Sequence, residues 1–171
     1  MAGIADKNEK TKRYDIVVGG GGYVGLSLAV AIASQAPHLN IMIADAAPKE
    51  ALNKDERASA IAAAATRMLS TLGVWPQIAP DAQPINEMIV TDSKLSDVTR
   101  PVFLTFGDTA QEGEAGEPFA HMVPNRTMIK ALRKRADALG IEQRFSAPVG
   151  GFEREQSGVT VTMADGEICQ A

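Results

Sequence analysis

Four consecutive glycines at residues 19–22 follow a short β-branched run at 16–18. A run of Ile and Val that stops at glycine is typical of a buried strand entering a turn. Residues 23–35 are mostly helix-competent and apolar on nearly every side, which predicts a helix covered on most faces. A second apolar run at 41–44 ends at Asp45, so strand, helix and strand follow within about thirty residues, the length of a βαβ unit. The two strands are therefore predicted to be parallel.

The glycines fit the pattern G-x-G-x-x-G in a register that begins at Gly20. A start at Gly19 would put Val24 in the third position, where helix and strand must touch closely. With Gly20, Gly22 and Gly25, the first glycine permits a sharp turn, the second lets the main chain approach a pyrophosphate, and the third lets the helix lie against the strand. The amides that open the helix lack intrahelical acceptors and would point at the phosphates. The turn therefore predicts a dinucleotide site.

Asp45 stands at the end of the second strand, 20 residues beyond Gly25. A carboxylate at this place accepts hydrogen bonds from ribose hydroxyls in dinucleotide-binding domains. It also repels a 2′-phosphate on that ribose, so NADP is the dinucleotide least expected here. A solvated residue at a strand end, or a cap for the following turn, is the structural alternative for Asp45. The pattern alone does not separate FAD from NAD.

The remaining chain predicts a Rossmann-like α/β domain with added antiparallel strands. Residues 46–57 are polar and form a loop longer than the roughly two to six residues usual after a strand. Helices are expected at 59–72 and 125–139, and strands at 85–91, 102–106, 141–145, 149–154 and 159–163. The two strands within 85–106 are expected to be antiparallel neighbours, and the last strands a β-meander. Residues 1–13 are polar and lack the apolar segment of a signal peptide, which predicts a disordered tail before a domain over 14–171.

The charge pattern argues against nucleic acid as a partner. The formal net charge is −4, from 17 basic and 21 acidic residues, and the longest basic run, Arg133-Lys134-Arg135, has only three residues. The expected helix at 125–139 carries four basic residues on its outward face, Lys130, Arg133, Lys134 and Arg135. We interpret them as a solvated face, because cations near a helix C-terminus suit the helix dipole.

Cysteine and histidine are too scarce for a structural metal or a disulfide. Cys169 has no partner for an internal disulfide, and with only His38 and His121 beside it the chain cannot build a Cys/His zinc cage, so no metal site is expected. The most apolar stretch, 24–33, is far shorter than the about 20 apolar residues that cross a bilayer. We therefore expect a reduced, cytoplasmic protein.

Three segments resemble one known family far more specifically than the glycines do. They are DIVVGGGGYVGLSLAVAIA at 15–33, DERASAIAAAATRMLSTLGVW at 55–75 and MVPNRTMIKAL at 122–132. They resemble the N-terminal part of the ubiquinone-biosynthesis hydroxylases of the 2-octaprenyl-6-methoxyphenol hydroxylase type, which are FAD-dependent aromatic monooxygenases with the para-hydroxybenzoate hydroxylase fold. The resemblance covers nearly all of 14–171. It implies that the strands within 85–106 belong to the substrate-side sheet.

The resemblance also implies the cofactor, the reaction and the site residues. A flavin reduced by NAD(P)H would use O₂ to hydroxylate a prenylated phenol in ubiquinone biosynthesis. By position, Gly20, Gly22 and Gly25 match the pyrophosphate loop, and Asp45 matches the ribose-binding acid, which is Glu in many members. Arg57 matches an arginine that lies against the pyrophosphate and ribityl region, where its planar fork can engage two phosphate oxygens.

Asn125 and Arg126 match family positions that touch the flavin side of the cofactor. Each assignment has a structural alternative: Asn125 is sufficient as a plain N-cap, and Arg57 could simply pair with Asp55 or Glu56. The family's chemistry needs no catalytic triad, and we assign no catalytic residue. A prenylated substrate is compatible with peripheral contact with the inner membrane or with a biosynthetic complex.

Two further expectations concern the whole protein. The family's two Asp/Gly motifs would lie beyond Ala171, since Asp165-Gly166 occupies a hairpin turn. We therefore expect an incomplete, N-terminal piece of a longer enzyme that is inactive alone. The alternatives are a non-catalytic remnant and an NAD-dependent dehydrogenase or reductase domain. The latter should continue with a third parallel strand after its second helix, and the proline-rich passage after Leu72 argues against that.

Overall fold

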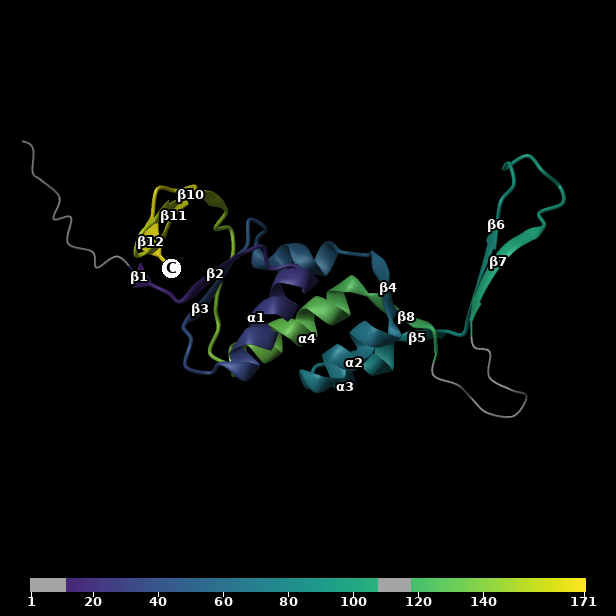
Figure 1. Cartoon of the computed structure of the whole chain (residues 1–171), viewed down its shortest axis with the longest axis horizontal. Coiled ribbons are helices and arrows are strands. Elements are labelled where there is room, and N and C mark those ends of the chain that lie inside the picture. Colours follow the sequence, from purple (N-terminus) through teal and green to yellow (C-terminus); the bar gives the residue numbers. More distant parts are fainter. Residues whose placement is uncertain (1–11, 108–117) are drawn as a thin grey trace, which may run out of the picture. The chain divides into compact units, whose positions relative to one another are not determined.

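The computed structural model describes residues 12–107 and 118–171, which form two compact units. The first unit combines the described residues up to Lys54 with those from Leu132 onward, and the second spans Asp55–Ala131. Helix α4 (Asn125–Ala138) contributes residues to both. Figure 1 labels the elements of each unit along the chain.

The first unit contains a three-stranded parallel sheet in the order β2, β3, β9. These strands are β2 (Ile16–Gly19), β3 (Ile41–Ala44) and β9 (Glu142–Arg144). Helix α1 (Tyr23–Gln35) makes the crossover from β2 to β3 (Figure 1). All four residues of β3 are buried, because the central strand of a parallel sheet is covered on both faces. The predicted βαβ unit is therefore confirmed.

Helix α1 buries one face instead of most of its surface. Leu26, Ala29 and Val30 are fully buried, whereas the side chains of Val24 and Leu28 are 71% and 53% exposed. The expectation of a helix covered on most faces is thus wrong for the described residues. An almost uniformly apolar helix sequence carries no signal for which face will pack against the sheet.

A second sheet of the first unit is built around a β-meander. Strands β10 (Val149–Glu155), β11 (Gly158–Met163) and β12 (Ile168–Gln170) pair antiparallel in that order, as expected. Strand β1 (Lys12–Arg13) adds to β12 in parallel. Lys12 and Arg13 therefore lie in a strand instead of the predicted tail, since the open edge of β12 supplies main-chain partners. Residues 1–11 of that tail lie outside the described residues.

The second unit holds a three-stranded antiparallel sheet in the order β4, β8, β5. These strands are β4 (Ala58–Ala62), β8 (Ala120–Pro124) and β5 (Gln83–Ile85). The expected helix at 59–72 is shorter, since α2 (Ala63–Thr71) begins only after β4. Cross-strand pairing with β8 overrides the helical preference of the alanines, as propensity is a weak prior.

Each unit also contains short helical turns. They are η1 (Lys49–Lys54) in the expected long loop of the first unit, and α3 (Trp75–Ile78) and η2 (Ala79–Asp81) in the second unit.

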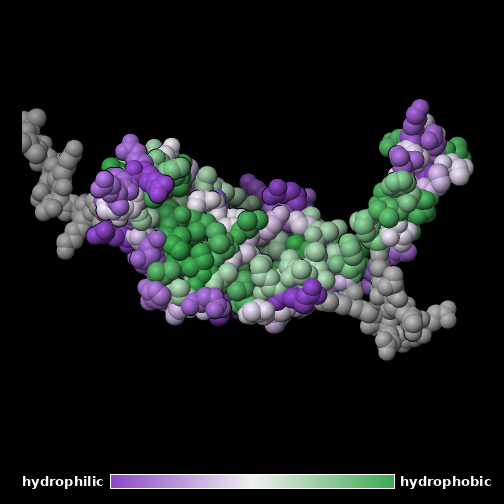
Figure 2. Space-filling model, viewed as in Figure 1, coloured by the Kyte–Doolittle hydropathy of each residue, from purple (hydrophilic) through white to green (hydrophobic). Residues whose placement is uncertain are grey.

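Strands β6 (Glu87–Thr91) and β7 (Val102–Gly107) form a two-stranded antiparallel hairpin, as predicted. The expected strand at 85–91 is divided, because Ile85 pairs in β5 and Glu87 begins β6. Large apolar side chains are exposed on this hairpin (Figure 2). The exposed fraction of Phe103 is 72%. An isolated hairpin of this kind is only marginally stable in water.

Candidate cofactor-binding site

The turn between β2 and α1 has the backbone that a diphosphate loop requires. Gly20 has a φ of +106°, a conformation that glycine adopts without strain, and its N–H donates to the Ala44 carbonyl over 2.8 Å. A Cβ on Gly25 would overlap the Gly20 carbonyl oxygen and lie 3.3 Å from Val18 Cγ1. Gly25 therefore allows α1 to approach β2, as the sequence predicted.

Gly22 is the N-cap residue just before α1 and leaves the N-terminus of that helix open. Within the described part of the chain, no atom lies within 4 Å of a Cβ built on Gly22, and the φ of −74° would allow any residue there. Among the residues that the structure describes, no side chain caps the N-terminus of α1, and the first turn of this helix carries no acidic residue. The first-turn amides are thus available to an anion that the helix dipole favours. These residues fit a bound diphosphate.

Asp45 is fixed at the end of β3 by its own main chain. Its N–H donates to the Arg144 carbonyl, and its carbonyl accepts from the Ala147 N–H, both over 2.9 Å. Its carboxylate Oδ1 accepts from the Ala47 N–H over 3.1 Å. The turn-capping alternative for Asp45 is therefore present in the structure, and it occupies one carboxylate oxygen.

The other carboxylate oxygen of Asp45 faces the glycine turn. A Cβ on Gly21 would stand 2.7 Å from Asp45 Oδ2, so no side chain fits at Gly21 while Asp45 keeps this position. The turn and the acid that the sequence predicted for diphosphate and ribose are thus adjacent. The pattern G-x-G-x-x-G assigns no role to Gly21, which is its first variable position. The uninterrupted run of four glycines is the signal that this position also excludes side chains.

Arg133 of α4 is the second partner of the Asp45 carboxylate. Its Nη2 lies 3.6 Å from Asp45 Oδ2, and its side chain is only 13% exposed. The interpretation of Arg133 as part of a solvated helix face is therefore wrong. Burial lowers the pKa of Arg133 from its ordinary value, and the charges of Asp45 and Asp137 oppose that shift. Spacing along the helix could not identify this partner.

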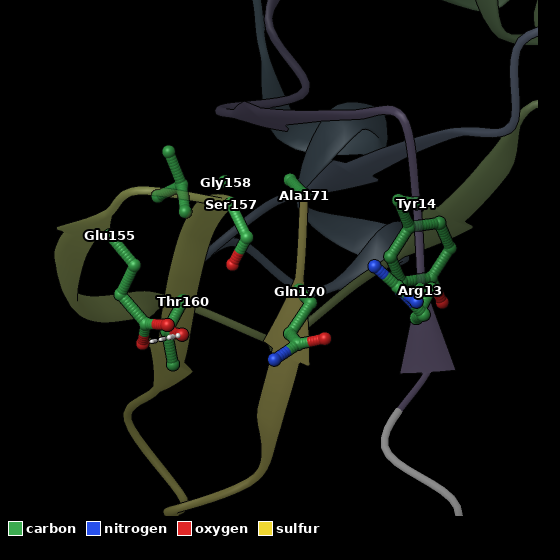
Figure 3. Close-up of a pocket in the computed structure, with 9 residues that line it drawn as sticks. Arg13, Tyr14, Glu155, Ser157, Gly158, Thr160, Gln170 and Ala171 are labelled. Carbon is green, nitrogen blue, oxygen red and sulfur yellow. Dashed lines mark hydrogen bonds between the residues drawn. The ribbon is translucent and has the colours of Figure 1, made fainter.

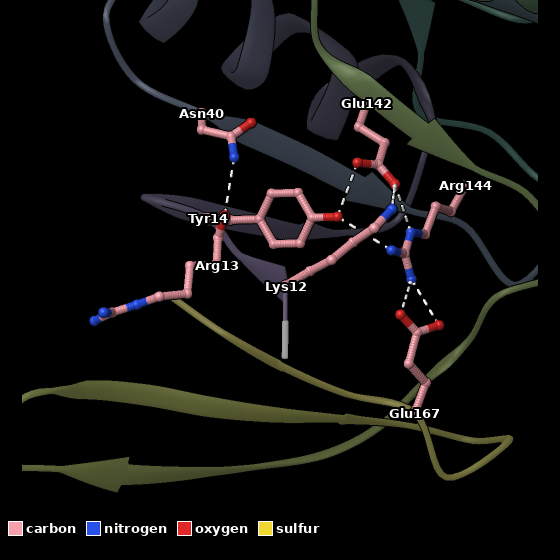
Figure 4. Close-up of polar contacts among 7 residues, drawn as sticks. All are labelled: Lys12, Arg13, Tyr14, Asn40, Glu142, Arg144 and Glu167. Carbon is pink, nitrogen blue, oxygen red and sulfur yellow. Dashed lines mark hydrogen bonds and ion pairs between the residues drawn. The ribbon is translucent and has the colours of Figure 1, made fainter. Parts of the chain in front are cut away.

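A polar cluster surrounds the side chains of Glu142 and Arg144 on β9 (Figure 4). Arg144 donates to Glu142 over 2.8 Å and to both carboxylate oxygens of Glu167 over 2.9 Å. Tyr14 donates to Glu142 over 2.8 Å, and Lys12 pairs with the same carboxylate at 3.3 Å. Burial alone would lower the pKa of Arg144, but its bonds to the two glutamates raise it.

Arg57 and Asn125 lie together in the second unit. The Asn125 N–H donates to the Arg57 carbonyl over 2.9 Å, and the buried Asn125 side chain accepts from Ser59 Oγ over 2.7 Å. Asn125 is the first residue of α4, and Arg126 beside it is exposed.

The Arg57 guanidinium donates two hydrogen bonds of 2.9 Å to the Asp55 carboxylate. Its side chain is nonetheless 81% exposed. Hydrogen bonds from the Arg57 side chain and N–H lower the pKa of Asp55 to about 2. The pairing that the sequence left as an alternative for Arg57 is therefore present.

The β-meander carries a small hollow that does not belong to this site (Figure 3). Its volume is about 50 Å³, and its lining includes Arg13, Tyr14, Gly158 and Gln170. Ligand pockets for drug-sized molecules are larger, about 300–1,000 Å³. The hollow is therefore too small for a dinucleotide.

Within 12–107 and 118–171, no group of three or more His, Cys, Asp or Glu side chains is placed to hold a metal ion. No helix in these ranges is long and apolar enough to cross a membrane.

The fold and the glycine turn define a dinucleotide-binding domain of Rossmann type. Residues 13–168 match the family described as "FAD binding domain". The chain belongs to this family, which confirms the expected fold class and FAD as its cofactor. The third parallel strand, β9, follows α4 instead of α2, unlike the order expected of an NAD-dependent dehydrogenase.

Relatives support the resemblance to the ubiquinone-biosynthesis hydroxylases. The chain is 32% identical over 175 residues to the ubiquinone hydroxylase UbiL of Rhodospirillum rubrum, covering 100% of the chain and 37% of that protein. It is 30% identical over 135 residues to the mitochondrial ubiquinone biosynthesis monooxygenase COQ6 of Xenopus tropicalis, covering 74% of the chain and 27% of that protein. The chain thus spans about a third of the length of these relatives.

Solved structures agree on the fold. PqsL of Pseudomonas aeruginosa, a probable FAD-dependent monooxygenase, superposes with a TM-score of 0.68 at 15% identity, over 93% of this chain and 40% of that one. The flavin-dependent monooxygenase PieE, solved in complex with FAD and substrate, gives a TM-score of 0.67 at 17% identity, over 93% of this chain and 29% of that one.

Proposed function

We propose that this chain is the FAD-binding part of an FAD-dependent monooxygenase that hydroxylates a polyprenyl phenol in ubiquinone biosynthesis, with NAD(P)H as electron donor and O₂ as co-substrate. The observation that carries the proposal is the open glycine turn with the Asp45 carboxylate against Gly21. The names of UbiL and COQ6 support the ubiquinone assignment. A bound flavin would supply the redox chemistry of oxygen transfer.

In this proposal, the chain's residues bind and orient the cofactor. The first-turn amides of α1 hold the diphosphate, with Gly22 leaving room for its oxygens. Asp45 Oδ2 accepts from ribose hydroxyls, while Oδ1 keeps its bond to the Ala47 N–H. Asp is one methylene shorter than the Glu of many members. Its carboxylate therefore stays close to the turn, where one oxygen binds the Ala47 N–H and the other is left for the ribose.

We also propose that Arg57, Asn125 and Arg126 serve the flavin side of the cofactor. The exposed Arg57 guanidinium supports this role, because its pairing with Asp55 leaves most of its surface accessible. Asn125 is less accessible, since it is buried and bonded to Ser59. Its role would be to fix the Arg57 main chain through its N–H.

The β6–β7 hairpin is proposed to belong to the substrate-side sheet. Its exposed apolar side chains, Phe103 among them, support this role, because a prenylated substrate needs an apolar environment. We further propose that catalysis requires segments beyond these 171 residues, given the length of the relatives.

FAD titration of the purified chain tests the site. Flavin fluorescence should be quenched on binding, and Asp45→Asn should weaken the affinity about tenfold, because a charge-assisted hydrogen bond is lost. Asp92→Asn, which removes the same charge at an exposed position, is the control. Equal FAD affinity in Asp45→Asn and the unmodified chain would reject the ribose role.

An oxidation assay tests the reaction. We expect no phenol-dependent NAD(P)H oxidation by the FAD-loaded 171-residue chain. The complete polypeptide should oxidise NAD(P)H in a manner that requires both FAD and a prenylated phenol. A complete polypeptide that binds FAD but fails to hydroxylate any prenylated phenol would reject the substrate assignment.

A further inference from the structure

We propose that Arg133 is a positioning residue that holds the Asp45 carboxylate in the orientation that receives the cofactor ribose. The inference rests on the proposed function, because it takes the ribose role of Asp45 as its starting point. It adds a residue from α4, far along the chain from the glycine turn, to the site. Arg133 would act through Asp45, without touching the cofactor.

The Arg133 side chain is anchored on three sides, all within the first unit. Its Nη1 donates to the Lys49 carbonyl over 3.2 Å. Its guanidinium carbon lies 4.5 Å from the centre of the Phe145 ring, a cation–π geometry. Its Nη2 faces Asp45 Oδ2. A guanidinium held by a carbonyl, a ring and a carboxylate has little freedom to move.

The main chain that carries Arg133 is also fixed. Gln143 of β9 donates through Nε2 to the Arg133 carbonyl over 3.1 Å and to Asp137 Oδ1 over 2.6 Å. The same strand supplies the Arg144 carbonyl that binds the Asp45 N–H. Arg133 and Asp45 are therefore attached to one strand, β9, which keeps their separation constant.

The distance between Arg133 and Asp45 fits a residue that positions the carboxylate without using up its capacity to accept hydrogen bonds. At 3.6 Å, the contact between Arg133 Nη2 and Asp45 Oδ2 is too long for a good hydrogen bond, yet close enough for strong attraction between charges. Oδ2 therefore keeps its acceptor capacity for a ribose hydroxyl. The Asp45 carboxylate is held by the Ala47 N–H on Oδ1 and by the Arg133 charge on Oδ2. Gly21 leaves the space that the carboxylate occupies.

The anchors require arginine specifically. A lysine could keep the charge near Asp45, but it lacks the planar fork that reaches the Lys49 carbonyl while stacking on Phe145. Arg133→Lys should therefore retain part of the effect and Arg133→Gln none of it. Lys134→Gln is the matched control, because it removes one charge from the neighbouring exposed position of α4.

The first test uses the chain without cofactor. Hydrogen exchange of the Ala47 amide, which bonds to Asp45 Oδ1, reports whether the carboxylate keeps its place. Arg133→Gln should speed this exchange several-fold, and Lys134→Gln should leave it unchanged. Unchanged Ala47 exchange in a folded Arg133→Gln variant would overturn the proposal.

The second test is a double-mutant cycle on FAD affinity. Arg133→Gln should weaken FAD about tenfold, with Arg133→Lys intermediate. In an Asp45→Asn background, Arg133→Gln should cost almost nothing, because the two residues act through one contact. Independent, additive losses would show that Arg133 is merely structural and would overturn the inference.

The two proposals fail in different ways. If Asp45→Asn leaves FAD binding unchanged, the ribose role fails. If Asp45→Asn weakens binding and Arg133→Gln does not, only the positioning role fails. If Arg133→Gln does not fold, Arg133→Lys replaces it in both tests. An Arg133→Lys variant with the Ala47 exchange rate and the FAD affinity of the unmodified chain would likewise overturn the proposal.

Discussion

Gly25 lies so close to the main-chain oxygen of Gly20 that a side chain cannot be placed between them. The obstacle is backbone, so relief requires α1 to move away from β2. We expect Gly25→Ala to lower the free energy of unfolding by about 1–3 kcal/mol, the usual cost of overpacking. Urea denaturation followed by circular dichroism measures this loss.

Gly22→Ala is the matched control for Gly25→Ala. A Cβ at Gly22 meets no described atom within 4 Å, and the φ of −74° suits alanine, so the free energy of unfolding should hardly change. FAD affinity should nonetheless fall by about tenfold or more, because the added methyl occupies the space through which the diphosphate approaches the amides. A Gly22→Ala variant that binds FAD normally would contradict the diphosphate role of this turn.

Gly21→Ala tests the contact with Asp45. The new Cβ would stand 2.7 Å from Asp45 Oδ2 and 3.1 Å from Asp45 Cβ, so the carboxylate must rotate away. FAD affinity should fall about tenfold, as in Asp45→Asn, and the two changes together should cost no more than one alone. Isothermal titration of the three variants checks this. Additive losses would mean that Gly21 acts independently of Asp45.

Much of the first unit could be predicted because its signals are local. The glycine turn, α1 and β3 follow one another in the chain, and their apolar runs and glycine spacing suffice to place them. Strand β4 could not be predicted, because its alanine-rich sequence favours a helix until β8 offers cross-strand partners. Strand β1 likewise depends on β12, which lies at the other end of the chain.

The residues of the candidate site likewise differ in whether local sequence signals identify them. Gly20, Gly22, Gly25 and Asp45 belong to one crossover, so a fixed spacing identifies them. Arg133 is polar, lies on a helix with other basic residues, and becomes buried only when Asp45 and Phe145 fold against it. Periodicity could not separate it from its solvated neighbours.

The ion pair between Asp55 and Arg57 predicts how the stability of the folded protein changes in acid. The pKa of Asp55 is about 2, below its ordinary value, so the charged carboxylate is favoured in the folded state. Its stabilising effect is present above pH about 4 and is lost as the pH falls through about 2. NMR titration of the Asp55 carboxyl carbon should give a midpoint near 2. In Arg57→Gln the midpoint should rise towards the ordinary value, and a midpoint unaffected by this change would contradict the pairing.

The Tyr14 phenol predicts how the stability of the folded protein changes at high pH. Burial and donation to Glu142 raise its pKa to about 12, so the folded state holds the phenol proton more tightly than the unfolded chain. The stabilising effect is complete below pH about 10 and is lost as the pH rises through about 12. Tyr14→Phe should cost about 1 kcal/mol at neutral pH and remove the pH dependence of stability in that window. In a Tyr23→Phe background, the ultraviolet absorbance of tyrosinate reports Tyr14 alone, and a midpoint near 10 in the folded protein would contradict the bond to Glu142.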